Sequence, residues 1–312
     1  RAYATAEVND GIVTPQTTLL SVADLASLTP THKTVRCKGC ANRCLLTIND
    51  FGIDEETGKH RRFVTGNRCE KGAGVKKSDK DKAPNLFEYK YKRLFGYEPL
   101  TAEAATRPTV GLPRALNFYE NYPFWFTFFN ELGFRVVLSD ESTKKTYEAG
   151  IESMPSESVC YPAKLSHGHI MNLIDKGVDF IWMPCIRHER QEDPDATNHY
   201  NCPVVASYSE VLKLNVEEIG PDGTMPFLNP FVPYDDEEVL SKRLYEEISE
   251  KYFSAHPEAK GTAPTREEIE KAVHVAWKED ERFKQDIRDK GEETLAWMNL
   301  TGTHGIVLAG RP

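Results

Sequence analysis

From residue 109 the chain alternates between short apolar runs and helical segments, and this alternation restricts the fold more than any other feature. The apolar runs are TVGLPRAL from residue 109, FRVVLSD from 134, VDFIWMPC from 178 and PVVASY from 203. Helical patterns lie between the first three, in FYENYPFWFTFFNELG and CYPAKLSHGHIMNLIDKG. Strands that alternate with helices form βαβ units around a parallel sheet. We therefore predict an α/β domain over residues 109–234.

The remaining segments differ in composition. They are a Thr/Ser-rich extended arm or linker at 1–34, a small cysteine-rich unit with a β-hairpin at 35–75, a lysine-rich connector at 76–108, and a charged helical segment at 235–312. Thr265 precedes Glu268 by three residues, which is a capping-box pattern and predicts a helix start. The last run, THGIVLAGRP, reads as a strand that begins a further α/β domain, so we expect the chain to be a piece of a longer protein.

Composition excludes several classes of protein. The 312 residues are 39% hydrophobic and carry a formal charge of −9, which is typical of a soluble globular chain and disfavours nucleic acid as a partner. No apolar run approaches the roughly 20 residues of a membrane helix, and the N-terminal residues lack the apolar core of a signal peptide. We therefore predict a cytoplasmic protein that does not bind membranes. In the cytoplasm disulfides are disfavoured, so clustered cysteines indicate metal or redox chemistry.

Four cysteines form the first candidate site. Cys37, Cys40 and Cys44 lie in one short segment, and the predicted hairpin returns Cys69 to its neighbourhood. A C-x₂-C pair with further thiolates nearby suits a tetrahedral zinc or a [4Fe–4S] cluster. The spacing does not distinguish the two metals, and unliganded structural thiols are the alternative.

Three cysteines form a looser second group. Cys160 precedes Pro162 at a predicted helix start, and Cys185 ends a predicted strand, so both face the crevice at the carboxyl edge of the sheet. Cys202 precedes the run PVVASY, and a parallel strand there would place it on the opposite edge. Each of these three cysteines could instead be a small buried hydrophobic residue.

Other residues carry weaker signals. His167 and His169 follow Cys160 and raise the possibility of a cysteine-dependent transferase or hydrolase, but no third orienting group is evident. Arg187, His188 and Glu189 follow Cys185 and read as surface charges. The aromatic run after residue 118 reads as core packing. Neither a G-x-x-x-x-G-K-[ST] motif nor a G-x-G-x-x-G motif after a strand is present, so nothing predicts nucleotide binding.

Several motifs together carry a resemblance to a known family. They are VRCKGCANRCLLTI, GNRCEKG, VGLPRALNFYENYPFWFTFFNELGF, ESVCYPAKLSHGH, FIWMPCI, NCPVVASY and GIVLAGRP. In order and residue type they resemble the region downstream of the ATPase modules in the large activase-related proteins of the 2-hydroxyacyl-CoA (2-hydroxyglutaryl-CoA) dehydratase family. The resemblance covers most of residues 35–312.

The resemblance implies a function that spacing alone does not. In that family, ATP hydrolysis drives an electron to a low-potential iron–sulfur centre held by cysteine thiolates among Rossmann-like domains. It makes 109–234 a Rossmann-like domain, Cys160, Cys185 and Cys202 cofactor-binding residues, and the quartet a second metal site. The expected cofactor is a [4Fe–4S] cluster, and the expected role is electron transfer. The expected partners are ATPase modules of the same longer chain or a separate reductase, with an acyl-CoA as a possible substrate.

The sequence therefore leaves two hypotheses for the function of the chain. In the first, the chain is the iron–sulfur, electron-transferring part of an activase-like protein, a fragment of an ATP-dependent reductase or dehydratase-activator system with no complete active site of its own. In the second, it is a non-catalytic interaction module with a structural zinc at Cys37, Cys40, Cys44 and Cys69.

Overall fold

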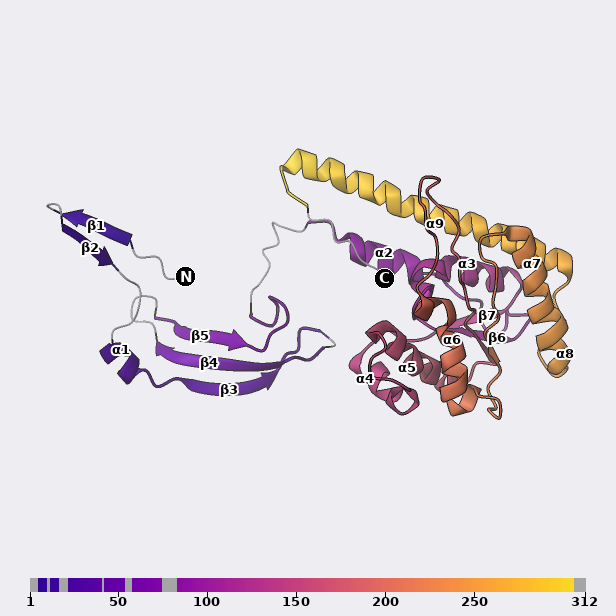
Figure 1. Cartoon of the computed structure of the whole chain (residues 1–312), viewed down its shortest axis with the longest axis horizontal. Helices are drawn as coiled ribbons and strands as arrows, with labels where there is room; N and C mark the ends of the chain where they lie inside the picture. The colour runs from indigo at the N-terminus through magenta and orange to yellow at the C-terminus, as the bar shows by residue number, and fades with distance from the viewer. Residues whose placement is uncertain are drawn as a thin grey trace. The chain divides into compact units, whose positions relative to one another are not determined.

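The computed structural model describes residues 5–9, 12–16, 22–40, 42–53, 58–74 and 83–305. Contacts within the chain divide it into two compact units, residues 1–82 and 83–312. Each unit is described by itself below (Figure 1).

The smaller unit is built from antiparallel strands. Its elements are β1 (Thr5–Asn9), β2 (Ile12–Gln16), α1 (Val22–Ser27), β3 (Thr31–Arg36), β4 (Leu45–Ile53) and β5 (His60–Thr65). β1 pairs with β2, and β3, β4 and β5 form a separate three-stranded sheet in that order. The predicted hairpin is therefore present as β4 and β5. β3 precedes them in the sequence and pairs with the other edge of β4.

The larger unit contains the predicted parallel sheet, so the α/β fold class is confirmed. Its strands are β6 (Thr109–Leu112), β7 (Arg135–Leu138), β8 (Phe180–Trp182) and β9 (Phe227–Leu228). The strand order is β7-β6-β8-β9, and every pairing is parallel.

Helices cover both faces of this sheet. They are α2 (Leu86–Phe95), α3 (Phe118–Glu131), α4 (Lys144–Ala149), α5 (Tyr161–Asp175), α6 (Pro203–Asn215), α7 (Glu237–Tyr245), α8 (Phe253–Ala255) and α9 (Arg266–Thr301). Two 3₁₀ turns, Ile151–Ser153 and Glu217–Ile219, and a π-helical segment, Glu246–Tyr252, complete the unit. Figure 1 shows α4, α5 and α6 on one side of the strands and α2, α3, α7 and α9 on the other.

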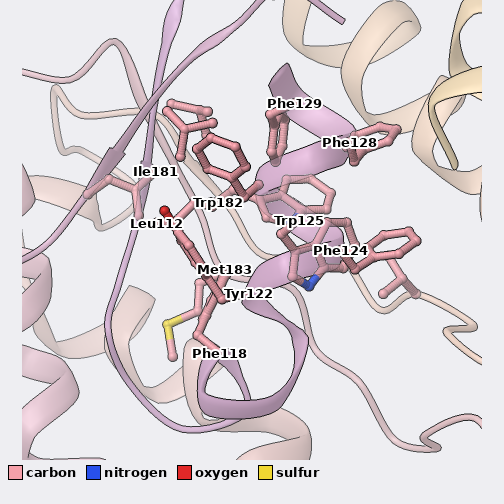
Figure 2. Packing of buried hydrophobic residues seen from close by; sticks show 14 of the residues in the cluster. Leu112, Phe118, Tyr122, Phe124, Trp125, Phe128, Phe129, Ile181, Trp182 and Met183 are labelled. Carbon is pink, nitrogen blue, oxygen red and sulfur yellow. The ribbon is translucent and has the colours of Figure 1, made fainter. Parts of the chain in front are cut away.

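The aromatic run of α3 forms the centre of the core, as predicted. The ring of Trp125 lies 5.3 Å from that of Trp182 on β8, and Phe124 lies 4.8 Å from Trp277 on α9. Figure 2 shows the side chains of α3 gathered beside Leu112, Ile181 and Trp182 of the sheet. Because α3 contacts both the sheet and α9, it joins the predicted helical segment to the α/β body.

Two further predictions meet different outcomes. Thr265 and Glu268 do form a capping box, and α9 begins there as expected. The predicted terminal strand falls mainly on residues 306–312, which lie outside the described residues. Across the part of the chain that the structure describes, no helix has both the length and the apolar character needed to span a membrane.

Candidate functional site

The carboxyl edge of the parallel sheet is the place where a ligand site is expected. The chain leaves β6 for β7 on one side and then crosses to β8 on the other side of β6. Open α/β sheets bind ligands where the strand order reverses in this way, outside the carboxyl ends of the strands. The starts of α5 and α6 and the loop after β8 all lie at this edge.

Cys160 and Cys202 occupy equivalent positions in the fold. Cys160 is the N-cap of α5 with φ −60° and ψ 151°, and Cys202 is the N-cap of α6 with φ −64° and ψ 153°. Pro162 and Pro203 lie in the first turns, where proline is favoured. The Val205 amide donates to Cys202 Sγ at 3.4 Å. Both cysteines therefore lie at helix N-termini, which carry unpaired amides and the positive end of the helix dipole.

The prediction of a strand at 203–208 is wrong, and so is the edge that it assigned to Cys202. These residues open α6. A β-branched pair, Val204 and Val205, gives the run its strand-like composition, but these side chains, Tyr208 and Leu212 follow a helical spacing and pack on the core. Because a helix that follows a parallel strand starts at the carboxyl end of the sheet, Cys202 lies on the same edge as Cys160.

Cys185 is held apart from the other two thiols. It is 1% exposed, and burial raises the pKa of its thiol. Its Sγ lies 3.0 Å from Ser209 Oγ, two turns or about 10 Å along α6 from Cys202. The structure therefore does not bring Cys160, Cys185 and Cys202 together as one ligand set.

The side chain of His167 on α5 contacts the 3₁₀ turn Ile151–Ser153 and α6. The Ser153 hydroxyl donates to the Gly150 carbonyl and can accept from His167 Nδ1 at 2.8 Å. That arrangement leaves His167 Nε2 to accept from the Tyr208 hydroxyl at 3.0 Å. Burial lowers the pKa of His167 to about 4, and burial followed by the charge of Cys160 raises the pKa of Tyr208.

His169 has equally complete partners. Its Nδ1 lies 2.9 Å from Ser139 Oγ and its Nε2 lies 2.9 Å from Ser142 Oγ, and burial lowers its pKa to about 4. In the described residues both histidines are thus engaged by hydroxyl groups on each nitrogen. This geometry supplies no Cys–His pair of the kind that a cysteine-dependent hydrolase needs.

Glu189 is a site residue that sequence reasoning assigned to the surface. Its carboxylate accepts from Asn121 of α3 at 3.1 Å and from Asn201 at 2.6 Å. Burial raises the pKa of Glu189. These two hydrogen bonds hold the loop between β8 and α6 against α3. Asn201, which makes one of them, directly precedes Cys202. No local signal marks this role, since Asn121 is 68 residues away.

The cysteine quartet lies at one end of the three-stranded sheet. Arg36 pairs with Leu45 and Thr47 with Thr65, so β3 ends, β4 begins and β5 ends on the same side. The Cys37 amide donates to the Cys44 carbonyl at 2.8 Å.

A second set of contacts brings the last cysteine close. The Gly39 amide donates to Cys37 Sγ at 3.3 Å. A Cβ at Gly39 would touch Lys71, two residues beyond Cys69. The predicted return of Cys69 towards the other three thiols is consistent with these contacts.

The thiols of the quartet do not converge on one point. Throughout the described ranges, no group of three or more His, Cys, Asp or Glu side chains is arranged to hold a metal ion. The residue types and the N–H···S contact suit a thiolate site, and the side chains would have to turn inward to form it.

Comparison with known proteins identifies a family for the larger unit. No curated protein and no solved structure matches the chain. Residues 109–312, well over half of the chain, match the model of the family described as CoA enzyme activase uncharacterised domain (DUF2229), and the chain belongs to that family.

Proposed function

We propose that this chain is the iron–sulfur-binding, electron-transferring part of an activase of CoA enzymes. The observation that carries the proposal is the equivalent placement of Cys160 and Cys202, each capping a neighbouring helix at the carboxyl edge of the parallel sheet. Thiolates are the usual ligands of iron–sulfur clusters, and helix N-termini favour negatively charged groups. The family match supports the activase part of the proposal.

The three cysteines at the edge have different roles in this proposal. Cys160 and Cys202 are proposed as ligands from the N-termini of α5 and α6. Cys185 can join them only if its side chain leaves Ser209 and the core, so its role as a ligand depends on that rearrangement. When bound, a [4Fe–4S] cluster would accept and donate single electrons at a potential set by its ligands, hydrogen bonds and exposure.

The quartet is proposed to hold a second metal. Among the described residues 22–74, Leu46 is the one apolar side chain that is fully buried. Small units that bury few apolar side chains usually depend on a disulfide, a metal or a partner to fold. This observation favours a structural zinc at Cys37, Cys40, Cys44 and Cys69, and it is the basis of the alternative function as an interaction module. A [4Fe–4S] cluster would use the same four thiolates.

The partners follow from the proposed role. An electron carrier of this kind needs a reductase that supplies electrons at the expense of ATP, and a dehydratase that uses them. These would be other modules of a longer protein or separate subunits, and an acyl-CoA would be the final substrate.

The test is metal and acid-labile sulfide analysis of protein purified without oxygen, with visible and electron paramagnetic resonance spectra. The proposal expects iron and sulfide in near-equal amounts and a broad absorption near ~400 nm. Cys160→Ser and Cys202→Ser should each remove part of the iron, whereas Cys37→Ser should affect a separate population of metal. Zinc alone, lost only on substitution in the quartet, would leave the interaction module as the function.

A further inference from the structure

The outer edge of β9 is an unpaired sheet edge that lies inside a groove. β9 is the last strand in the order β7-β6-β8-β9. A hollow of about 510 Å³ runs along residues 226–231. One wall comes from α6, including Lys213, and the other from α7 and the π-helical segment, including Arg243 and Tyr252. The groove, called the β9 groove below, is thus the position that the next strand of the sheet would occupy between the two helical layers.

The backbone pattern shows which groups face this groove. The carbonyls of Pro226, Leu228 and Pro230 accept from amides of Ile181, Met183 and Cys185 on the inner side. Strand geometry then directs the backbone groups of the intervening residues, Phe227, Asn229 and Phe231, outward.

Within the described part of the chain, the amides of Phe227, Asn229 and Phe231 have no hydrogen-bond acceptor. The Phe231 carbonyl accepts from Arg243 Nε at 3.3 Å. Phe227 and Asn229 are 9% and 7% exposed, so little of either residue is open to bulk solvent. Native proteins satisfy nearly all such groups, which makes this edge incomplete as it stands.

The walls of the groove decide between possible occupants. A second copy of the chain could pair with this edge only by bringing its own β9 alongside. Both β9 strands are recessed between helices, so the helices of the two copies would clash before the strands could pair. A single extended peptide segment has the required width. It also supplies the amide and carbonyl groups that the edge lacks, as in β-strand addition.

Charge and exposure indicate the side chains of that segment. Lys213 Nζ contacts Asn229 Oδ1 at 3.3 Å, and among the described residues it has no carboxylate partner. Phe231, at the end of the groove, is 54% exposed. The lining also carries Arg243 and Lys251, which both pair with Glu247, and Glu210, whose Oε1 accepts from Asn229 Nδ2 at 2.8 Å. The three cations outnumber the two carboxylates. One acidic side chain beside Lys213 and an apolar side chain beside Phe231 therefore complement the groove.

We propose that the β9 groove binds an extended segment of another polypeptide, about five residues long, which adds a fifth strand to the sheet through Phe227, Asn229 and Phe231. The segment alternates apolar residues with acidic or hydroxyl residues. This binding surface is independent of any metal at the cysteines, and its test needs no electron transfer.

The first test is amide hydrogen exchange on the chain alone. The Phe227, Asn229 and Phe231 amides should exchange at least ~100-fold faster than those of Ile181, Met183 and Cys185, which lie in the ladder. Equal protection of the two sets would mean that the edge is already paired, and it would overturn the proposal.

The second test uses a library of heptapeptides that alternate Val, Ile, Leu or Phe with Thr or Glu. Binders should protect the Phe227, Asn229 and Phe231 amides and should lose affinity at least tenfold when alternate peptide amides are N-methylated. Lys213→Gln should weaken Glu-containing binders but not their Gln analogues, while Lys271→Gln on exposed α9 should change neither. A library without binders, or binders that tolerate N-methylation, would overturn strand addition.

Discussion

Gly168 of α5 lies directly against the backbone of Thr146 of α4, so close that a Cβ at Gly168 would overlap the Thr146 carbonyl oxygen. A Cβ at Gly150, at the end of α4, would in turn meet Gly168 N and His167. The two helices therefore approach each other through glycine. This approach brings Ser153 within hydrogen-bond distance of His167, which in turn contacts Tyr208 of α6.

We expect Gly168→Ala to destabilise the larger unit by about 3 kcal/mol, because the α4 backbone must move to admit the methyl group. Gly291→Ala is the matched control, since Gly291 is also helical but has nothing within 4 Å of an added Cβ. That substitution should stabilise by about 0.5–1 kcal/mol through helix propensity. Chemical denaturation of both variants measures the difference. Similar free energies of unfolding would contradict the close helix contact.

Stability should also depend on pH through His167 and His169. Burial lowers the pKa of each to about 4 from an ordinary value of 6.5. The unfolded chain therefore binds more protons than the folded chain between these values, and the folded state loses stability as pH falls from about 6.5 to 4. Each histidine accounts for a loss of up to about 3 kcal/mol in the free energy of unfolding across that pH range.

His169→Gln isolates one of these contributions. The variant should lose stability at pH 7 and should show a shallower fall in the free energy of unfolding between pH 6.5 and pH 4. Urea denaturation at several pH values measures both quantities. An unchanged slope would mean that His169 is not held neutral by burial.

Local patterns in the sequence predict much of the fold, and the exceptions have physical causes. The strand from Thr109, the aromatic helix α3 and the capping box at Thr265 all follow from signals a few residues long. The start of α6 was missed because β-branched residues favour strands locally, while Pro203 and contacts with the core select a helix. The sequence does not predict β3, because its residues are mostly exposed and lack the alternation of apolar and polar residues that marks a strand.

The candidate site was predictable only in part for the same reason. Cys160 at a helix start follows from Pro162 next to it in sequence. The Glu189–Asn121 contact and the burial of Cys185 against Ser209 depend on segments that meet only in the folded chain. The pattern of cysteines therefore identified the candidates but not which of them lie together.

Alkylation of the native protein should separate the cysteines of the larger unit. Cys160 is exposed and Cys202 is half-buried, whereas Cys185 is buried and its pKa is raised. With iodoacetamide at pH 7.5, we expect Cys160 to react first and Cys185 to react only through global unfolding, orders of magnitude more slowly. Mass spectrometry of peptides gives the rates, and denatured protein is the control. Comparable rates at Cys160 and Cys185 would show that Cys185 readily leaves Ser209.

The last prediction concerns the fold of the smaller unit. If a metal at the quartet stabilises this unit, Cys69→Ser should abolish binding of that metal and unfold the smaller unit, because structural zinc contributes on the order of 10 kcal/mol to such units. The larger unit has its own core and should keep its melting temperature. Cys202→Ser is the control and should leave the melting of the smaller unit unchanged. Calorimetry with metal analysis measures both transitions, and a Cys69→Ser protein that keeps a folded smaller unit would show that its stability does not come from a metal.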